Sequence, residues 1–165
     1  MNKKCLGLKI GGIVCSVVAF LAMLFPFVIS NYTLYTQHDS KSYSETMSFK
    51  NWLEVLKIDS DKMWAWQLSR VLMIVVLILV ALVSVTSIVN IFIKKKISKN
   101  IFKYVSVAGI VLSSLFVVFF FIGCLLQFSS GQYASGVVFP HVGSILLGVS
   151  SLVASILNLK SLKHE

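Results

Sequence analysis

The segment from residue 49 to residue 70 contains the residue types most able to form a site in this chain. It holds all three tryptophans, three of the six acidic residues and the only arginine. Asp59 and Asp61, two positions apart, could donate carboxylate oxygens to calcium, which takes about six to eight oxygen ligands. Only Ser60 adds a further oxygen here, so the sequence favours a turn in which the acids cap a helix.

His141 is the second candidate for chemistry, because a histidine at membrane depth can relay protons or sense pH. It follows Pro140, and no acidic residue lies in any apolar run to partner it. We expect a hydrogen-bonded interfacial histidine, with a pH or polar role as the alternative. The sequence has no paired carboxylates, Ser/His/Asp set, HxxxH pair or phosphate-binding glycine loop. We therefore predict a protein that is not an enzyme and uses no metal or cofactor.

The elements around these residues are dominated by four long apolar runs, at about 10–30, 71–93, 104–127 and 136–158. The chain is 57% hydrophobic and only 13% charged. About 20 helical residues cross the hydrocarbon core of a bilayer, and backbone groups in lipid must satisfy one another within the segment. The predicted fold class is an all-α integral membrane protein, a bundle of four transmembrane helices that forms one domain.

The lysines predict the orientation of this bundle. Ten of them precede the first run, join the second and third, or follow the last: Lys3, Lys4, Lys9, Lys94, Lys95, Lys96, Lys99, Lys103, Lys160 and Lys163. The positive-inside rule then places both termini in the cytoplasm, with the plasma membrane as the location. Topology explains the formal charge of +9, so the lipid bilayer is the expected partner and nucleic acid is not.

The connection over residues 31–66 is the only outer segment large enough for a small domain, because "SSGQYASG" after the third run predicts a tight loop. Phe49, Trp52, Leu53 and Leu56 recur at helical spacing. They predict an amphipathic helix over about residues 48–58, capped by Ser48. The polar stretch before it predicts loop or some strand.

Arg70 opens the second run, where a charge in hydrocarbon costs several kcal/mol unless it snorkels or pairs. Snorkelling to the headgroups is the first explanation. The alternative is pairing with Asp59, Asp61 or loop carbonyls, which would fasten the outer segment to the bundle. We therefore expect the stretch 49–70 to anchor the outer segment and to form its recognition surface. The residues assigned to this role are Arg70, Trp52, Trp64, Trp66, Asp59 and Asp61.

Two runs carry small residues at helical spacing, which lets helices approach closely in lipid. The first run presents Gly7 and Gly11, followed by Cys15 and Ala19. The fourth presents Ser144, Gly148, Ser151 and Ser155. These faces predict that the first and last helices pack together, with a partner protein as the alternative.

The layout resembles the claudin and peripheral-myelin-protein tetraspan superfamily. "WQLSRVLMIVVLILVAL" is similar to the family's entry into its second span, "AGIVLSSLFVVFFFIG" to its third, and "GVVFPHVGSILLGVSSLVAS" to its small-residue-rich fourth. The resemblance implies a sheet-like first outer loop and a role in membrane organisation or adhesion. The family's first-loop signature of tryptophan, Gly-Leu-Trp and two cysteines is missing, so no paracellular pore is implied.

These observations predict a non-enzymatic tetraspan protein that acts by association with a partner membrane protein or as a homo-oligomer. The alternative is a small bacterial membrane protein of the transport-accessory or toxin-immunity type.

Overall fold

A computed structural model describes residues 3–35, 39–55, 64–92, 99–127, 129–130 and 134–164. Four long helices dominate it: α1 (Lys3–Leu21), α3 (Trp64–Phe92), α4 (Lys99–Leu126) and α5 (Val142–Ser161). Each is long and apolar enough to cross a membrane. Short 3-10 turns extend α1 (η1, Ala22–Leu24) and α5 (η3, Leu162–His164).

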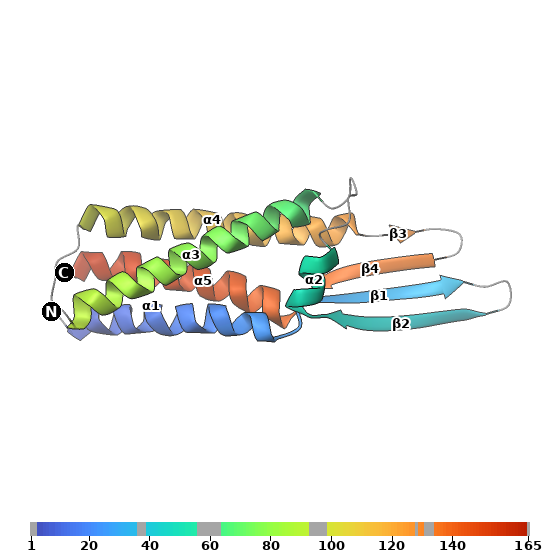
Figure 1. Cartoon of the computed structure of the whole chain (residues 1–165), viewed down its shortest axis with the longest axis horizontal. Coiled ribbons are helices and arrows are strands. Elements are labelled where there is room, and N and C mark those ends of the chain that lie inside the picture. The colour runs from blue at the N-terminus through green and yellow to red at the C-terminus, as the bar shows by residue number, and fades with distance from the viewer. Residues whose placement is uncertain are drawn as a thin grey trace.

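The four helices form a bundle in which α1 packs on α5, and α4 packs on both α3 and α5. Figure 1 shows both termini at one end of this bundle and a sheet projecting from the other end. The surface of the bundle is apolar: Val14, Ile78, Val118 and Val149, one from each helix, are about half exposed. Its interior holds many serines beside the apolar core, so the polar hydroxyls are buried and the exposed surface is apolar, as expected of a helix bundle in lipid.

A four-stranded antiparallel sheet corrects the expected all-α class. Its strands are β1 (Val28–Tyr35), β2 (Ser40–Met47), β3 (Ser129–Ser130) and β4 (Ala134–Pro140), in the order β2-β1-β4-β3. The first and second outer connections therefore build one sheet together. Figure 1 shows that β1, β2 and β4 run along the long axis of the bundle.

The outer connection before α5 also differs from the expected tight loop. Residues 136–140 belong to β4 and not to the fourth helix, which begins at Val142. Val137, Val138 and Phe139 are β-branched or aromatic and favour a strand, and Pro140 biases the residue before it toward extended backbone. Pairing with β1 decides the outcome, from Val28 opposite Pro140 to Leu34 opposite Ala134.

Between β2 and α3 lies the short helix α2 (Phe49–Val55), within the predicted range of 48–58. Ser48 caps it, since its hydroxyl accepts a hydrogen bond of 3.2 Å from the amide of Asn51. Figure 1 shows α2 at the junction between the bundle and the sheet.

The contact between α1 and α5 uses a face of α1 that overlaps the predicted one only in part. Gly7 is exposed, and a Cβ built on it would meet no atom within 4 Å. The buried stripe includes Ala19, which was predicted, and otherwise runs through Cys5, Lys9, Gly12 and Ser16. Gly11 lies at its margin, where a Cβ would sit 3.2 Å from Leu157 of α5.

Asn158 explains why this stripe faces α5. Its buried side chain accepts a 3.0 Å hydrogen bond from the Ser87 hydroxyl of α3 and donates one of 2.9 Å to the Ala154 carbonyl. A Cβ on Gly12 would lie only 2.6 Å from it. A side chain at position 12 would displace this buried, hydrogen-bonded amide, which lies where α1, α3 and α5 meet in the half of the bundle away from the sheet (Figure 1).

The small residues of α5 lie inside the bundle. Ser144, Gly148, Ser151 and Ser155 are all buried. A Cβ on Gly148 would lie 2.5 Å from Val117 of α4, and Ser155 faces Gly109 of the same helix. Gly148 and Ser155 of this face therefore pack on α4, while Asn158 lies against α1 and Gly143 against the residues that follow α1.

Candidate functional site

The sheet is held on the bundle by four rings that we call the aromatic anchor: Phe27, Phe49, Trp52 and Phe120. Phe27 lies at its centre, with ring centroids 5.3 Å from Phe49, 5.1 Å from Trp52 and 5.4 Å from Phe120. Trp52 also contacts Phe120 of α4 at 5.5 Å. The anchor thus joins the chain before β1 and the short helix α2 to the outer half of α4.

Burial fixes the role of Trp52. Its exposed fraction is 0%, as is that of Phe27, and both belong to the hydrophobic core that includes Val28, Met73 and Leu147. A side chain with no exposed surface cannot contact a partner. The recognition role expected for Trp52 is therefore corrected: this tryptophan is an internal anchor.

Backbone hydrogen bonds reinforce the junction. The amide of Phe27 donates to the carbonyl of Met47 (2.8 Å), and its carbonyl accepts from the amide of His141 (3.1 Å). The amide of Gly143 donates to the carbonyl of Pro26 at 2.8 Å. A Cβ on Gly143 would lie 2.8 Å from three backbone carbonyl oxygens, so only glycine allows this approach of α5 to the end of α1.

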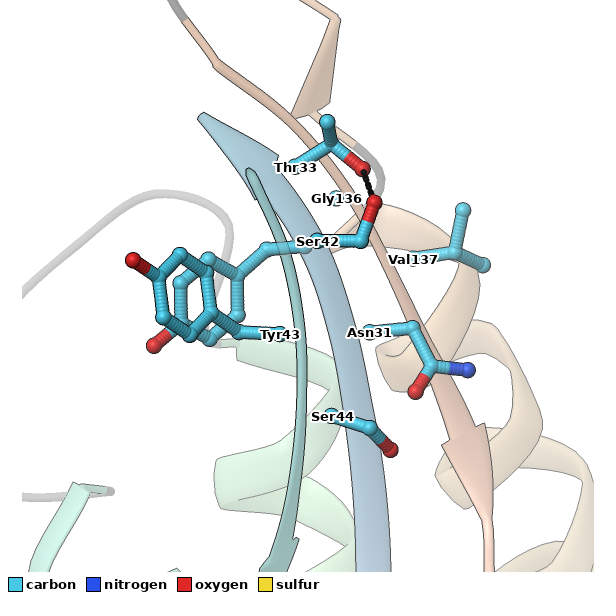
Figure 2. A pocket seen from close by; sticks show the side chains of 8 residues that line it. Asn31, Thr33, Ser42, Tyr43, Ser44, Gly136 and Val137 are labelled. Atoms are coloured by element: carbon cyan, nitrogen blue, oxygen red, sulfur yellow. Dashed lines mark hydrogen bonds between the residues drawn. The ribbon is translucent and has the colours of Figure 1, made fainter. Parts of the chain in front are cut away.

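Beyond the anchor, one face of the sheet is lined by hydroxyl and amide groups. Asn31 pairs with Ser44 and Val137, and Thr33 pairs with Ser42 across the strands. Figure 2 shows these side chains on one side of the sheet, with the Thr33 and Ser42 hydroxyls 3.1 Å apart in a hydrogen bond. We call Asn31, Thr33, Ser42 and Ser44 the polar face. It presents neutral hydrogen-bond donors and acceptors.

The opposite face carries two tyrosines. Tyr32 and Tyr43 stack across the strand pair with ring centroids 5.2 Å apart and planes at 18°. The Tyr32 hydroxyl donates a 3.1 Å hydrogen bond to a carboxylate oxygen of Glu45. That bond, with desolvation and the charge of Glu45, raises the pKa of Tyr32 above its usual value.

Gly136 of β4 stands opposite Tyr32. A hollow of about 520 Å³ is lined by residues of both faces, Asn31, Tyr32, Tyr43 and Gly136 among them.

Strand β2 forms one edge of this sheet. It pairs with β1 on one side, and no described strand pairs with its other side. All its residues are exposed except Met47, which is half-buried at the junction. An exposed edge leaves a row of backbone amides and carbonyls available for pairing with another strand.

The other residues assigned from the sequence lie at the start of α3 or outside the described part of the chain. Trp64 is 48% exposed and contacts Phe119 of α4 edge-on, with ring centroids 6.2 Å apart. Arg70 is half-buried in α3. Asp59 and Asp61, its predicted partners, lie outside the described residues, as does the side chain of Trp66. Their joint role stays a prediction.

His141 lies where β4 turns into α5. Its carbonyl accepts hydrogen bonds from the Ser144 hydroxyl (2.9 Å) and the Ile145 amide (3.2 Å). Its Nδ1 is buried and makes no hydrogen bond with any described residue. The backbone of His141 is thus part of the junction, whereas the proposed pH or polar role of its ring stays a prediction.

Sequence reasoning missed the polar face and the stacked tyrosines. The available signal was the alternation in "VISNYTLY" and "SKSYSETM", where every second residue shares a face of a strand. Among the described residues, no group of three or more His, Cys, Asp or Glu side chains could hold a metal ion. No protein-family model matches the chain, and a search of curated proteins finds no match either.

Proposed function

We propose that this chain is a non-enzymatic integral membrane protein that acts by association, with its outer sheet as the association surface. The observation that carries this proposal is a sheet with an exposed polar face and an exposed edge, fixed to a membrane-spanning bundle through buried rings. A surface that is held rigidly loses little conformational entropy on binding, which favours recognition.

The distribution of charge supports the orientation. Figure 1 shows both termini at the end of the bundle opposite the sheet. The helix bounds assign five lysines to that end, because they lie at the start of α1, near the start of α4 and near the C-terminus: Lys3, Lys4, Lys103, Lys160 and Lys163. Under the positive-inside rule that end is cytoplasmic and the sheet is outside. The strands in the first outer connection also agree with the sheet-like loop that the claudin resemblance implies, and we propose the membrane-organising or adhesive role on that basis.

The test is purification of the intact protein in mild detergent, followed by identification of the proteins that come with it. We expect a protein partner or a second copy to be retained. Ser42→Arg with Ser44→Arg on the polar face should remove it, whereas Lys50→Glu on the exposed side of α2 should retain it. A monodisperse monomer accompanied only by lipid contradicts the proposal.

A further inference from the structure

The edge strand β2 is nearly self-complementary when its sequence is reversed about Tyr43. If two copies of β2 lie antiparallel with Tyr43 opposite Tyr43, then Lys41 lies opposite Glu45 and Ser42 opposite Ser44. Ser40 then lies opposite Thr46. Every pair is of a kind that stabilises antiparallel strands: aromatic with aromatic, hydroxyl with hydroxyl, or opposite charges.

We propose that β2 pairs with β2 of a second copy of this chain in this register, and that the second copy stands in a facing membrane. The inference rests on the proposed function and names its partner.

The pairing would continue contacts that each copy already contains. Lys41, Tyr43 and Glu45 alternate along β2 and so share one face of the sheet. Tyr43 already stacks on Tyr32 of the same chain. Joining the two edges would place both Tyr43 rings side by side and extend each stack into a row of four tyrosines across the joined sheet.

Charge makes this edge selective. Charged residues on an edge strand normally deter pairing with other strands. Here Lys41 and Glu45 have opposite signs and lie at equal distances from Tyr43, so a second copy neutralises both of them at once. A strand that lacks this charge pattern would leave at least one charge without its opposite. The second copy is therefore the occupant that the edge itself specifies.

The direction of β2 decides where the second copy stands. β2 runs along the long axis of the bundle, and hence along the membrane normal (Figure 1). A copy in the same membrane points its β2 the same way, which brings Lys41 level with Lys41 and excludes antiparallel pairing. A copy in a facing membrane points its β2 the opposite way. Eight residues of strand span roughly 26 Å, so the overlapping sheets would hold the two membranes about one outer domain apart.

Charge reversal tests the register directly, using the full chain in phosphatidylcholine vesicles and measuring vesicle tethering by energy transfer between labelled lipids. Wild-type vesicles should tether. Lys41→Glu alone and Glu45→Lys alone each turn two attractive pairs into repulsive ones, so tethering should weaken about tenfold or more. Vesicles carrying Lys41→Glu mixed with vesicles carrying Glu45→Lys should tether again, as should the double variant. Lys50→Glu, the same charge change on α2, should tether like wild type.

Cysteine cross-linking is a second, independent readout. In a background without Cys5, Cys15 and Cys124, a copy with Ser42→Cys should form a disulfide with a differently tagged copy carrying Ser44→Cys. Thr46→Cys should not link to itself, because the two positions would lie roughly 20 Å apart in this register.

Three results would overturn the inference: no tethering by wild type, tethering that survives both single reversals, or cross-links only between copies in one vesicle. If wild-type vesicles do not tether but another protein still co-purifies in detergent, self-pairing fails while the association function stands. If wild-type vesicles do not tether and the protein purifies as a monomer with lipid alone, both self-pairing and the association function fail.

Discussion

Replacing Trp52 by alanine should loosen the outer domain far more than replacing Trp64. Trp52 is fully buried and contacts three aromatic rings. Burial of about 200 Å² at about 25 cal/mol per Å² corresponds to about 5 kcal/mol, and core Trp→Ala substitutions cost about 3–5 kcal/mol. Trp64 is 48% exposed and has one ring contact among the described residues, so its loss should cost about 2 kcal/mol.

The assay is amide hydrogen exchange of the peptides that cover β1 and β2, measured on the purified protein in detergent. A difference of about 2–3 kcal/mol corresponds to about a 30- to 150-fold difference in the open population of the sheet. Trp52→Ala should therefore exchange at β1 and β2 much faster than Trp64→Ala. Equal exchange in the two variants would refute the view that Trp52 fastens the sheet to the bundle.

Three further predictions concern single contacts. Gly143→Ala should lower the free energy of unfolding by about 1–3 kcal/mol, because its Cβ would meet three backbone carbonyl oxygens. The yield of folded protein in size-exclusion chromatography should therefore fall, whereas Gly7→Ala, whose Cβ meets no neighbour, should leave that yield unchanged. Asn158→Leu should lower the free energy of unfolding in dodecyl sulfate by about 1–2 kcal/mol, because the hydrogen bond between Ser87 of α3 and Asn158 of α5 is lost. An unchanged midpoint of the unfolding curve would contradict this. Glu45→Gln should lower the raised pKa of Tyr32 in an ultraviolet phenolate titration, because the hydrogen bond from Tyr32 to the Glu45 carboxylate is weakened. In wild type, the stability from this hydrogen bond should be present below about pH 10 and lost as pH rises through the raised pKa. Identical titrations of the two proteins would count against the bond.

The four spans could be predicted because length and hydropathy are local properties. About 20 apolar residues make a membrane helix wherever they occur, and the four runs in the sequence correspond to α1, α3, α4 and α5. The N-cap at Ser48 could be predicted for the same reason, because its hydroxyl bonds the amide of Asn51, three residues away. The pairing of β1 with β4 was not local, since it joins residues 28–34 to residues 134–140. No property of either segment alone specifies the other.

The interior of the bundle shows a second limit of sequence reasoning. Small residues occur on two neighbouring stripes of α1, and spacing alone selected the one through Gly7 and Gly11. The stripe through Gly12 faces α5 because Asn158 needs room there, which only the assembled helices reveal. Trp52 was assigned both an anchoring and a recognition role as part of the stretch 49–70, whereas it is fully buried and contacts Phe27 and Phe120 from distant parts of the chain.

The most direct test of the account places a photo-reactive amino acid at Ser44 on the polar face and, as a control, at Ile78 on the lipid-facing surface of α3. Irradiation in native membranes should give a discrete protein adduct from position 44, identified by mass spectrometry, and mainly lipid adducts from position 78. If position 44 gives no protein adduct while the protein is folded and present, the claim that the outer sheet is the association surface is contradicted.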